Sequence, residues 1–227
     1  MTLLNLNWPT SPEKAVRLQQ ELVSKIEHTP RLNPIRYVAG LDVHIRDEMG
    51  RAAIVVLDIE TLKPVDAATA IKPMNFPHKP GMLIFREGPV IFEALKRLDI
   101  WPDLLIFYGQ GIAYPDKIGL ASYLGALIDL PVIGCARTQT YGDHRKVPFR
   151  RGTYVLLRDN GAVIGAALRT RDGGNLLYVS PGHRLNLKTS IRYILMCCRH
   201  HAIPETNRWS KLFLGRVNTD VVRNNYK

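Results

Sequence analysis

Hydrophobic and polar residues are arranged in the first third of the chain as one helix followed by three strands. The helix begins after Ser11, the expected N-cap, with Pro12 at its first position, and it carries apolar residues along one side. Apolar, β-prone runs follow at 36–45, 52–58 and 66–71, with short polar turns between them. This pattern favours three antiparallel strands joined by hairpins.

The remaining pattern predicts helices and strands in alternation. The predicted elements are helices at 82–98, 118–128 and 188–200 and strands at 104–107, 132–133, 153–157, 162–168 and 176–179. Three antiparallel strands followed by alternating helices and strands are typical of an α/β domain with a mixed sheet and helices on both faces. At 227 residues the chain is long enough to bury the core of one such domain, which we expect to span residues 1–227.

The net charge of the chain says more about its partner than the overall composition does. Hydrophobic residues make up 46% of the chain and charged residues 22%, which is ordinary for a globular protein. Lys and Arg number 31 against 20 Asp and Glu, a net charge of +11, and most of the excess lies in the C-terminal part. A basic surface is typical of proteins that bind polyanions, so we expect a nucleic-acid partner. A soluble protein that is merely basic is the alternative.

Three cysteines, Cys135, Cys197 and Cys198, form neither a CxxC pair nor an even-numbered framework. The sequence therefore indicates neither a zinc site nor a disulfide scaffold, and it fits the reducing cytoplasm. No apolar run approaches the length that spans a bilayer, so we expect no membrane partner. We expect a monomer.

Two carboxylates are the strongest candidates for chemistry. Asp42 interrupts an apolar strand, where a lone carboxylate usually faces a metal or a basic partner. Glu87 lies in a predicted helix, and carboxylate oxygens are the ligands through which Mg²⁺ is held for phosphodiester hydrolysis. As alternatives, Asp42 could bond its own backbone, and Glu87 could be an exposed helix residue paired with Arg86.

Four further candidates lie near predicted turns and strand ends. His183, in the segment 180–184, can position a water or protonate a leaving group. Arg184 and Arg137 can bind phosphate, and the planar ring of His78 could stack on a base. We expect His183 to face Asp42 and Glu87, although either histidine could instead be structural.

The motifs of this chain, taken in order, resemble those of the endonuclease V family, which nicks nucleic acid near deoxyinosine (hypoxanthine). The resemblance covers nearly the whole chain. Its anchors are Ala39–Val43, Pro80-Gly81, Phe85–Glu87, Gly109 with Gly111, Gly119–Ser122, Leu130–Gly134, Leu168–Arg171, Ser180–Arg184 and Ile203–Arg208. The resemblance implies an RNase H-like fold and Mg²⁺-dependent (or Mn²⁺-dependent) cleavage. The family usually cuts the second phosphodiester 3′ to the lesion. For this chain the resemblance implies inosine-containing DNA as the substrate, with inosine in RNA as the alternative.

The resemblance also implies roles for individual residues. Asp42 and Glu87 match two metal-binding carboxylates, and His183 matches an active-site histidine. A pocket for the flipped base would be formed by Gly81, Leu83, Gly109 and Leu120, and His78 would be the wedge that separates the strands.

Four positions depart from the family pattern. The third metal-binding Asp is Tyr108 here, a nearby His is Tyr114, the wedge Tyr is His78, and a Lys near the site is Arg137. Losing one of three anionic ligands weakens Mg²⁺ binding, and Asp116 is a candidate replacement on the same loop. The leading hypothesis is a metal-dependent endonuclease. The alternative is a nuclease-impaired protein that binds inosine without cutting; an unrelated RNase H-like resolvase has little support.

Overall fold

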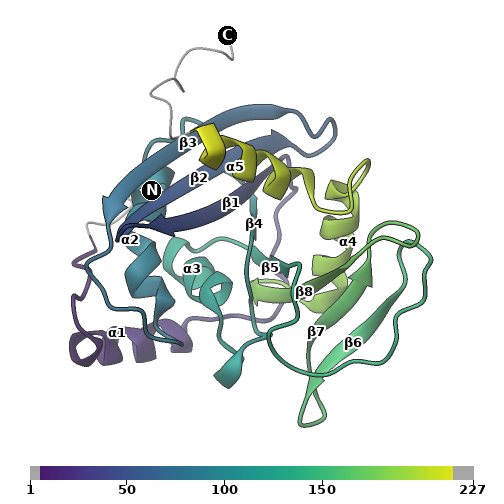
Figure 1. Ribbon diagram of the computed structural model, residues 1–227, viewed down its shortest axis with the longest axis horizontal. Coiled ribbons are helices and arrows are strands. Elements are labelled where there is room, and N and C mark those ends of the chain that lie inside the picture. Colours follow the sequence, from purple (N-terminus) through teal and green to yellow (C-terminus); the bar gives the residue numbers. More distant parts are fainter. Residues whose placement is uncertain (1–5, 217–227) are drawn as a thin grey trace.

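The computed structural model describes residues 6–216, and the described chain is built on one eight-stranded sheet (Figure 1). The strands, in spatial order, are β3 (Pro64–Pro73), β2 (Met49–Asp58), β1 (Tyr37–Arg46), β4 (Leu104–Phe107), β5 (Val132–Ala136), β8 (Leu176–His183), β7 (Ala162–Arg169) and β6 (Tyr154–Asp159). The helices are α1 (Pro12–Ser24), α2 (Leu83–Leu95), α3 (Leu120–Ile128), α4 (Leu187–Cys197) and α5 (Glu205–Arg216), with a 3₁₀ turn, η1 (Pro115–Lys117).

The sheet is mixed. Strands β1, β2 and β3 pair antiparallel, β1, β4 and β5 pair parallel, and β8, β7 and β6 return antiparallel. The carboxyl ends of β4 and β5 therefore lie at the same edge of the sheet as the middle of β1. This edge is where ligands usually bind in open α/β sheets.

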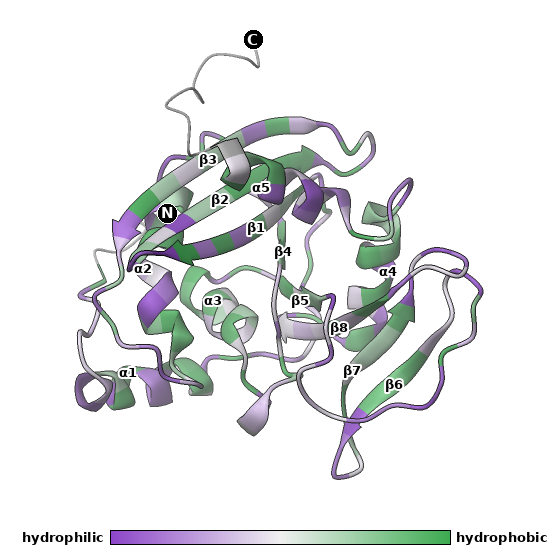
Figure 2. Ribbon diagram, in the orientation of Figure 1, coloured by the Kyte–Doolittle hydropathy of each residue, from purple (hydrophilic) through white to green (hydrophobic). Residues whose placement is uncertain are grey.

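Helices cover both faces of the sheet, as the sequence predicted. Ala39 and Leu41 of β1 pack in a core with α1, α2 and α3, whereas Val38 packs in a second core with α4 and α5. The alternation follows from the two-residue period of a strand. Figure 2 shows the central strands largely green and the long loop between β5 and β6 largely purple. The α/β fold class is confirmed.

Most predicted elements are present, with shifts of a few residues at their ends. Two predictions are wrong. Residues 180–183 continue strand β8 rather than forming a turn, and helix α5 was not predicted at all. Ser11 precedes α1 as expected, but its side chain makes no capping hydrogen bond. A single domain over the whole chain stays a prediction, because residues 1–5 and 217–227 lie outside the described part. Within the described part, no helix is long and apolar enough to cross a membrane.

Candidate metal centre and base pocket

Asp42 lies in β1 level with the end of β4, and its carboxylate is half-buried. Its Oδ1 accepts a hydrogen bond from the backbone N–H of Val43 at 2.9 Å. One carboxylate oxygen is therefore bonded to the neighbouring backbone, as the alternative interpretation of Asp42 predicted. Burial is the largest effect on Asp42 and raises its pKa above the usual range, while Lys211 and His44 act in the opposite direction. The carboxylate is therefore poorly solvated and within electrostatic range of Lys211.

Glu87 projects from α2 toward the same place. Burial raises its pKa to about 7; the Arg86 guanidinium opposes the rise and the Asp42 carboxylate adds to it. The Asp42 carboxylate therefore lies within electrostatic range of Glu87. Glu87 is thus not an exposed helix residue.

This donor set fits a divalent cation, because two crowded, poorly solvated carboxylates gain from sharing one. The resemblance predicts three metal-binding carboxylates, and these are only two. Within residues 6–216, no group of three or more His, Cys, Asp or Glu side chains is arranged to hold a metal ion. Asp116 lies in η1, and its side chain falls outside what the structure describes. The described residues therefore offer two carboxylates and leave the rest of the coordination open.

Tyr108 lies beside Asp42, at the position where the resemblance predicts a third carboxylate. Its side chain is 37% exposed. Burial raises the pKa of the phenol, Arg137 lowers it, and Asp42 raises it further. A phenol with a pKa above its ordinary value is neutral near pH 7, so Tyr108 contributes no charge to a cation.

Two basic side chains complete the surroundings of Asp42. Arg137 follows β5 and is near enough to act on Tyr108, while Lys211 of α5 acts on Asp42. The sequence reasoning singled out Arg137 but missed Lys211, because it missed α5. A signal for helix α5 was present in the sequence: Pro204 precedes Trp209 and Phe213, which are four residues apart, as on one helix face.

The predicted base pocket is largely assembled. Gly81, Leu83 and Leu120 line one cavity together with Gln110 and Tyr114. Gly109 does not line it. The cavity has a volume of about 30 Å³, which admits water but is far too small for a purine, so it must widen to admit the base.

The glycine loop after β4 is held by the Ser-Pro segment of β8. The hydroxyl of Ser180 accepts a hydrogen bond from the backbone N–H of Gly111 at 2.9 Å, and the carbonyl of Pro181 accepts one from Ile112 at 2.9 Å. A Cβ on Gly134 would lie 2.2 Å from the nitrogen of Gly111, so only glycine permits this approach. The segment thus positions the loop that lines the pocket.

His183 does not lie with the carboxylates, which corrects its predicted role. It pairs with Val132 at the start of β5, three strands away from β1 and at the opposite end of the parallel strands from Asp42. Strand spacings of about 4.8 Å and a rise of about 3.3 Å per residue put the two roughly 17 Å apart. The ring is buried, and its Nδ1 accepts the backbone N–H of Glu27 at 3.1 Å. Burial lowers its pKa to about 4, with a further lowering by Arg184.

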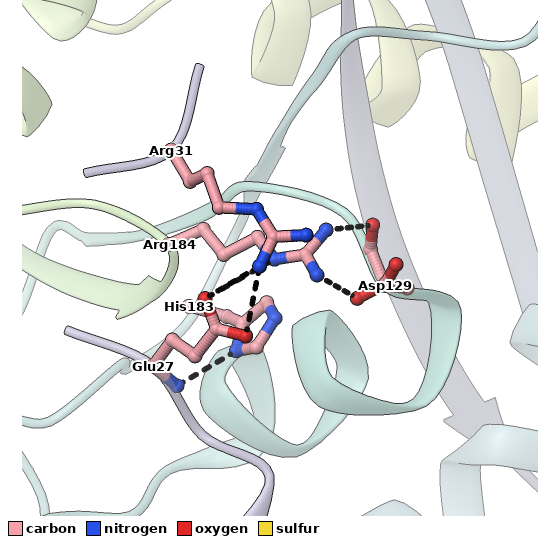
Figure 3. A network of polar contacts seen from close by, with 5 residues as sticks. All are labelled: Glu27, Arg31, Asp129, His183 and Arg184. Atoms are coloured by element: carbon pink, nitrogen blue, oxygen red, sulfur yellow. Dashed lines mark hydrogen bonds and ion pairs between the residues drawn. The ribbon is translucent and has the colours of Figure 1, made fainter. Parts of the chain in front are cut away.

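Arg184 is likewise structural rather than free to bind phosphate. Its guanidinium forms an ion pair with Asp129 and lies 3.6 Å from a carboxylate oxygen of Glu27 (Figure 3). Its Nη1 also donates to the backbone carbonyl of Asp129 at 2.9 Å, and the side chain is 12% exposed. The pair joins the segment after α1 to the end of α3, and this use of its charge explains why the phosphate prediction is wrong.

His78 lies exposed on the loop between β3 and α2, next to the base pocket in sequence. Arg86 is buried and anchors this loop, because it donates to the carbonyl of Phe76 at 2.5 Å and to Glu48 at 2.9 Å. Gly81 follows in a left-handed conformation, with φ at 79°. The loop that carries His78 is therefore fixed at both ends.

Comparison with known proteins agrees with these features. A model of the family described as Endonuclease V matches residues 20–212. Endonuclease V of Roseiflexus sp. (strain RS-1) is 45% identical over 201 residues, covering 88% of this chain and 90% of that protein. The crystal structure of Endonuclease V from Streptomyces avermitilis has a TM-score of 0.88 and 35% identity, covering 94% of this chain and 96% of that one.

A more distant structure shares the fold. Ciona intestinalis Endonuclease V was crystallised with a 24mer DNA containing an inosine followed by a ribo-adenosine. It has a TM-score of 0.74 and 21% identity, covering 92% of this chain and 98% of that one. The family model, the relatives and the mixed sheet agree: this chain belongs to the endonuclease V family of nucleases, which has an RNase H-like α/β fold.

Proposed function

We propose that this protein is a metal-dependent endonuclease that recognises deoxyinosine in DNA and cuts the strand 3′ to it. The observation that carries the proposal is that burial raises the pKa of both Asp42 and Glu87, and that the Asp42 carboxylate adds to the rise at Glu87, which favours a shared cation. Family membership supports the nuclease activity, and the net charge of +11 supports a nucleic-acid partner.

Asp42 and Glu87 would hold Mg²⁺ (or Mn²⁺). The bound ion supplies Lewis-acid stabilisation of the phosphate and a water made more acidic. Arg137 and Lys211 would contact the phosphate that is cut, because Lys211 acts on Asp42 and Arg137 acts on the adjacent Tyr108. Tyr108 stays neutral and offers a hydrogen bond in place of a third ligand.

The base would enter the cavity between Gly81, Leu83 and Leu120 after leaving the helix stack. His78, fixed on the anchored loop beside the cavity, would fill the space that the base vacates. Inosine in RNA is a second substrate to test, since the Ciona protein was crystallised on a strand with a ribonucleotide after the inosine.

One observation favours a second candidate function. Tyr108 replaces a carboxylate, whereas the pocket and the basic surface are retained, so a protein that binds inosine and cuts poorly is the alternative. We also propose a monomer, and a reducing compartment such as the cytoplasm, because Cys135, Cys197 and Cys198 are buried free thiols.

The experiment measures binding and product position together. Labelled duplexes with one deoxyinosine, or with deoxyguanosine in its place, are titrated with protein in Ca²⁺ and then started with Mg²⁺. Tighter binding to deoxyinosine and a product ending 3′ to it are expected. Selective binding without a product assigns the alternative function, and equal binding to both duplexes overturns the base recognition.

A further inference from the structure

The segment 145–151, between β5 and β6, exposes an aromatic ring to solvent. Phe149 is 65% exposed, the largest exposure among the large hydrophobic side chains of the described residues. We use the name Phe149 surface for a set of exposed side chains on this segment and on the adjoining turn 171–174. They are Arg145, Lys146, Phe149, Arg150 and Arg171.

The exposed position of Phe149 is built into the structure by a buried arginine. Arg169, 9% exposed, donates to the carbonyls of Pro148 and Val147, each at 3.3 Å, and to that of Gly174. Its guanidinium carbon lies 5.4 Å from the centre of the Phe149 ring. The carbonyl of Phe149 also accepts from the backbone N–H of Gly173 at 2.8 Å. The Phe149 ring is thus held in water on an anchored loop, where its face is available to a partner.

The charge around the ring indicates what kind of partner. Within residues 6–216, the side chains of Arg145, Lys146, Arg150 and Arg171 themselves make no hydrogen bond or ion pair, and only the backbone carbonyls of Arg145 and Arg150 accept from side chains. The single carboxylate in the two segments, Asp172, is occupied by the backbone N–H of Arg151 at 2.5 Å. Unpaired cations beside an exposed aromatic ring are the composition of surfaces that bind single-stranded nucleic acid.

The strand register places this surface on the same edge of the sheet as the carboxylates. Strand β7 ends at Arg169, which pairs with Leu176, and β5 ends at Ala136, which pairs with Tyr178. The carboxyl ends of β4, β5 and β7 therefore share the edge where Asp42 lies. Four strand spacings of about 4.8 Å separate β1 from β7, about 19 Å, which corresponds to several nucleotides along a bound strand.

We propose that the Phe149 surface binds the nucleic-acid strand several nucleotides away from the cut, with Phe149 stacked on an unpaired base and the four cations on phosphates. The inference rests on the proposed function, because the strand is the one carrying the inosine. It adds a second binding region that fixes the register of the flanking strand. An acidic protein partner would meet the same cations, but it would leave the flanking strand without a contact.

The test measures affinity by fluorescence anisotropy in EDTA, so that no cutting is needed. Two single strands carry one deoxyinosine, a short one with three flanking nucleotides on each side and a long one with twelve. Phe149→Ala should weaken binding of the long strand roughly five- to a hundredfold and leave the short strand unchanged. Phe149→Trp should keep the wild-type affinity, since it keeps the stacking surface.

Matched controls separate this effect from general damage. Ile71→Ala removes an exposed hydrophobic side chain on β3, the outermost strand on the side of the sheet away from β7. It should change the affinity for neither the short nor the long strand of DNA. Arg150→Gln should reduce the slope of log affinity against log salt concentration for the long strand by an amount that corresponds to about one phosphate contact. Lys96→Gln should leave this slope unchanged. Thermal unfolding of Phe149→Ala should match the wild type, because the ring contributes little buried area.

Wild-type affinity of Phe149→Ala for the long strand overturns the proposal, and so does an equal loss on both strands. Failure of this inference and failure of the proposed function give different results. If the wild type shows no preference for deoxyinosine and no nicking, base recognition fails, while the comparison of long and short strands still reports on Phe149.

Discussion

Tyr108 lies directly beside Asp42 in the sheet. Leu41 and Phe107 are register partners of β1 and β4, so the two residues that follow them are neighbours, and the backbone N–H of Tyr108 donates to the carbonyl of Leu41 at 3.1 Å. Asp42 also contributes to the raised pKa of the phenol. A neutral side chain therefore occupies a place where a carboxylate would bind a cation together with Asp42.

Tyr108→Asp should strengthen metal binding and raise Mg²⁺-dependent nicking. A third carboxylate adds charge and an oxygen ligand, so the gain should be largest at low Mg²⁺, where site occupancy limits the rate. Single-turnover nicking of a deoxyinosine duplex across a Mg²⁺ titration measures it, with Asp42→Ala as the inactive reference. Strong cutting by the wild type that the substitution abolishes would show that the metal is bound in another way, such as through Asp116.

Lys211→Met should slow nicking while leaving affinity for deoxyinosine DNA within a few-fold. Lys211 is exposed on α5 and lowers the pKa of Asp42, so its charge acts at the carboxylates rather than in the base cavity. A loss of about tenfold corresponds to about 1.4 kcal/mol of transition-state stabilisation. Lys211→Arg should recover most of the rate. Equal rates for Lys211→Met and the wild type would show that Lys211 is a bystander.

Glu87→Gln should stabilise the metal-free protein at pH 8 and change little at pH 4. The folded protein keeps the Glu87 proton up to about pH 7, against an ordinary value of 4.5. The folded state therefore binds more protons than the unfolded state, and stability falls as pH rises through this interval. The shift corresponds to at most about 3 kcal/mol.

Urea unfolding in EDTA at the two pH values measures this effect. Adding Mg²⁺ at pH 8 should stabilise the wild type and not Glu87→Gln, because the ion binds only the folded site. A wild type that is more stable than Glu87→Gln at pH 8 without metal would contradict the environment assigned to Glu87.

Arg184→Ala should destabilise the fold by about 1–2 kcal/mol, because Arg184 is only 12% exposed and loses its contacts with Asp129 and Glu27, whose carboxylates are themselves screened by water. Nicking by the folded fraction should be unchanged, since the pair lies far from the carboxylates. Arg31→Ala is the matched control: its side chain is 67% exposed and pairs with Glu27 at 3.5 Å, so its loss should cost less than about 1 kcal/mol. A nicking defect in Arg184→Ala with normal stability would restore the phosphate role.

The sequence predicted the sheet better than the site. Runs such as 104–107 are buried on both faces and can only be strands, whereas Pro181-Gly182 looks like a turn. Strand β8 accommodates Pro181 because it pairs with β7 only as far as Val179, and because a register shift occurs opposite Pro181. Because 180–183 form a strand and not a turn, His183 lies opposite Val132 and far from the carboxylates. Lys211 could not be found by motif, since a lone lysine on a polar helix face carries no signal until the helix is placed on β1.

Single-turnover nicking of a deoxyinosine duplex tests the central claim, that Asp42 and Glu87 hold the cation on which cutting depends. The wild type, Asp42→Asn, Glu87→Gln and the exposed control Glu60→Gln are compared in Mg²⁺, in Mn²⁺ and in EDTA. The account predicts a cut 3′ to deoxyinosine by the wild type and Glu60→Gln in either metal, no cut in EDTA, and a loss of at least about a hundredfold in both site variants. Cutting that survives in EDTA or in Asp42→Asn, or a wild type that binds Mg²⁺ and deoxyinosine but never cuts, would contradict it.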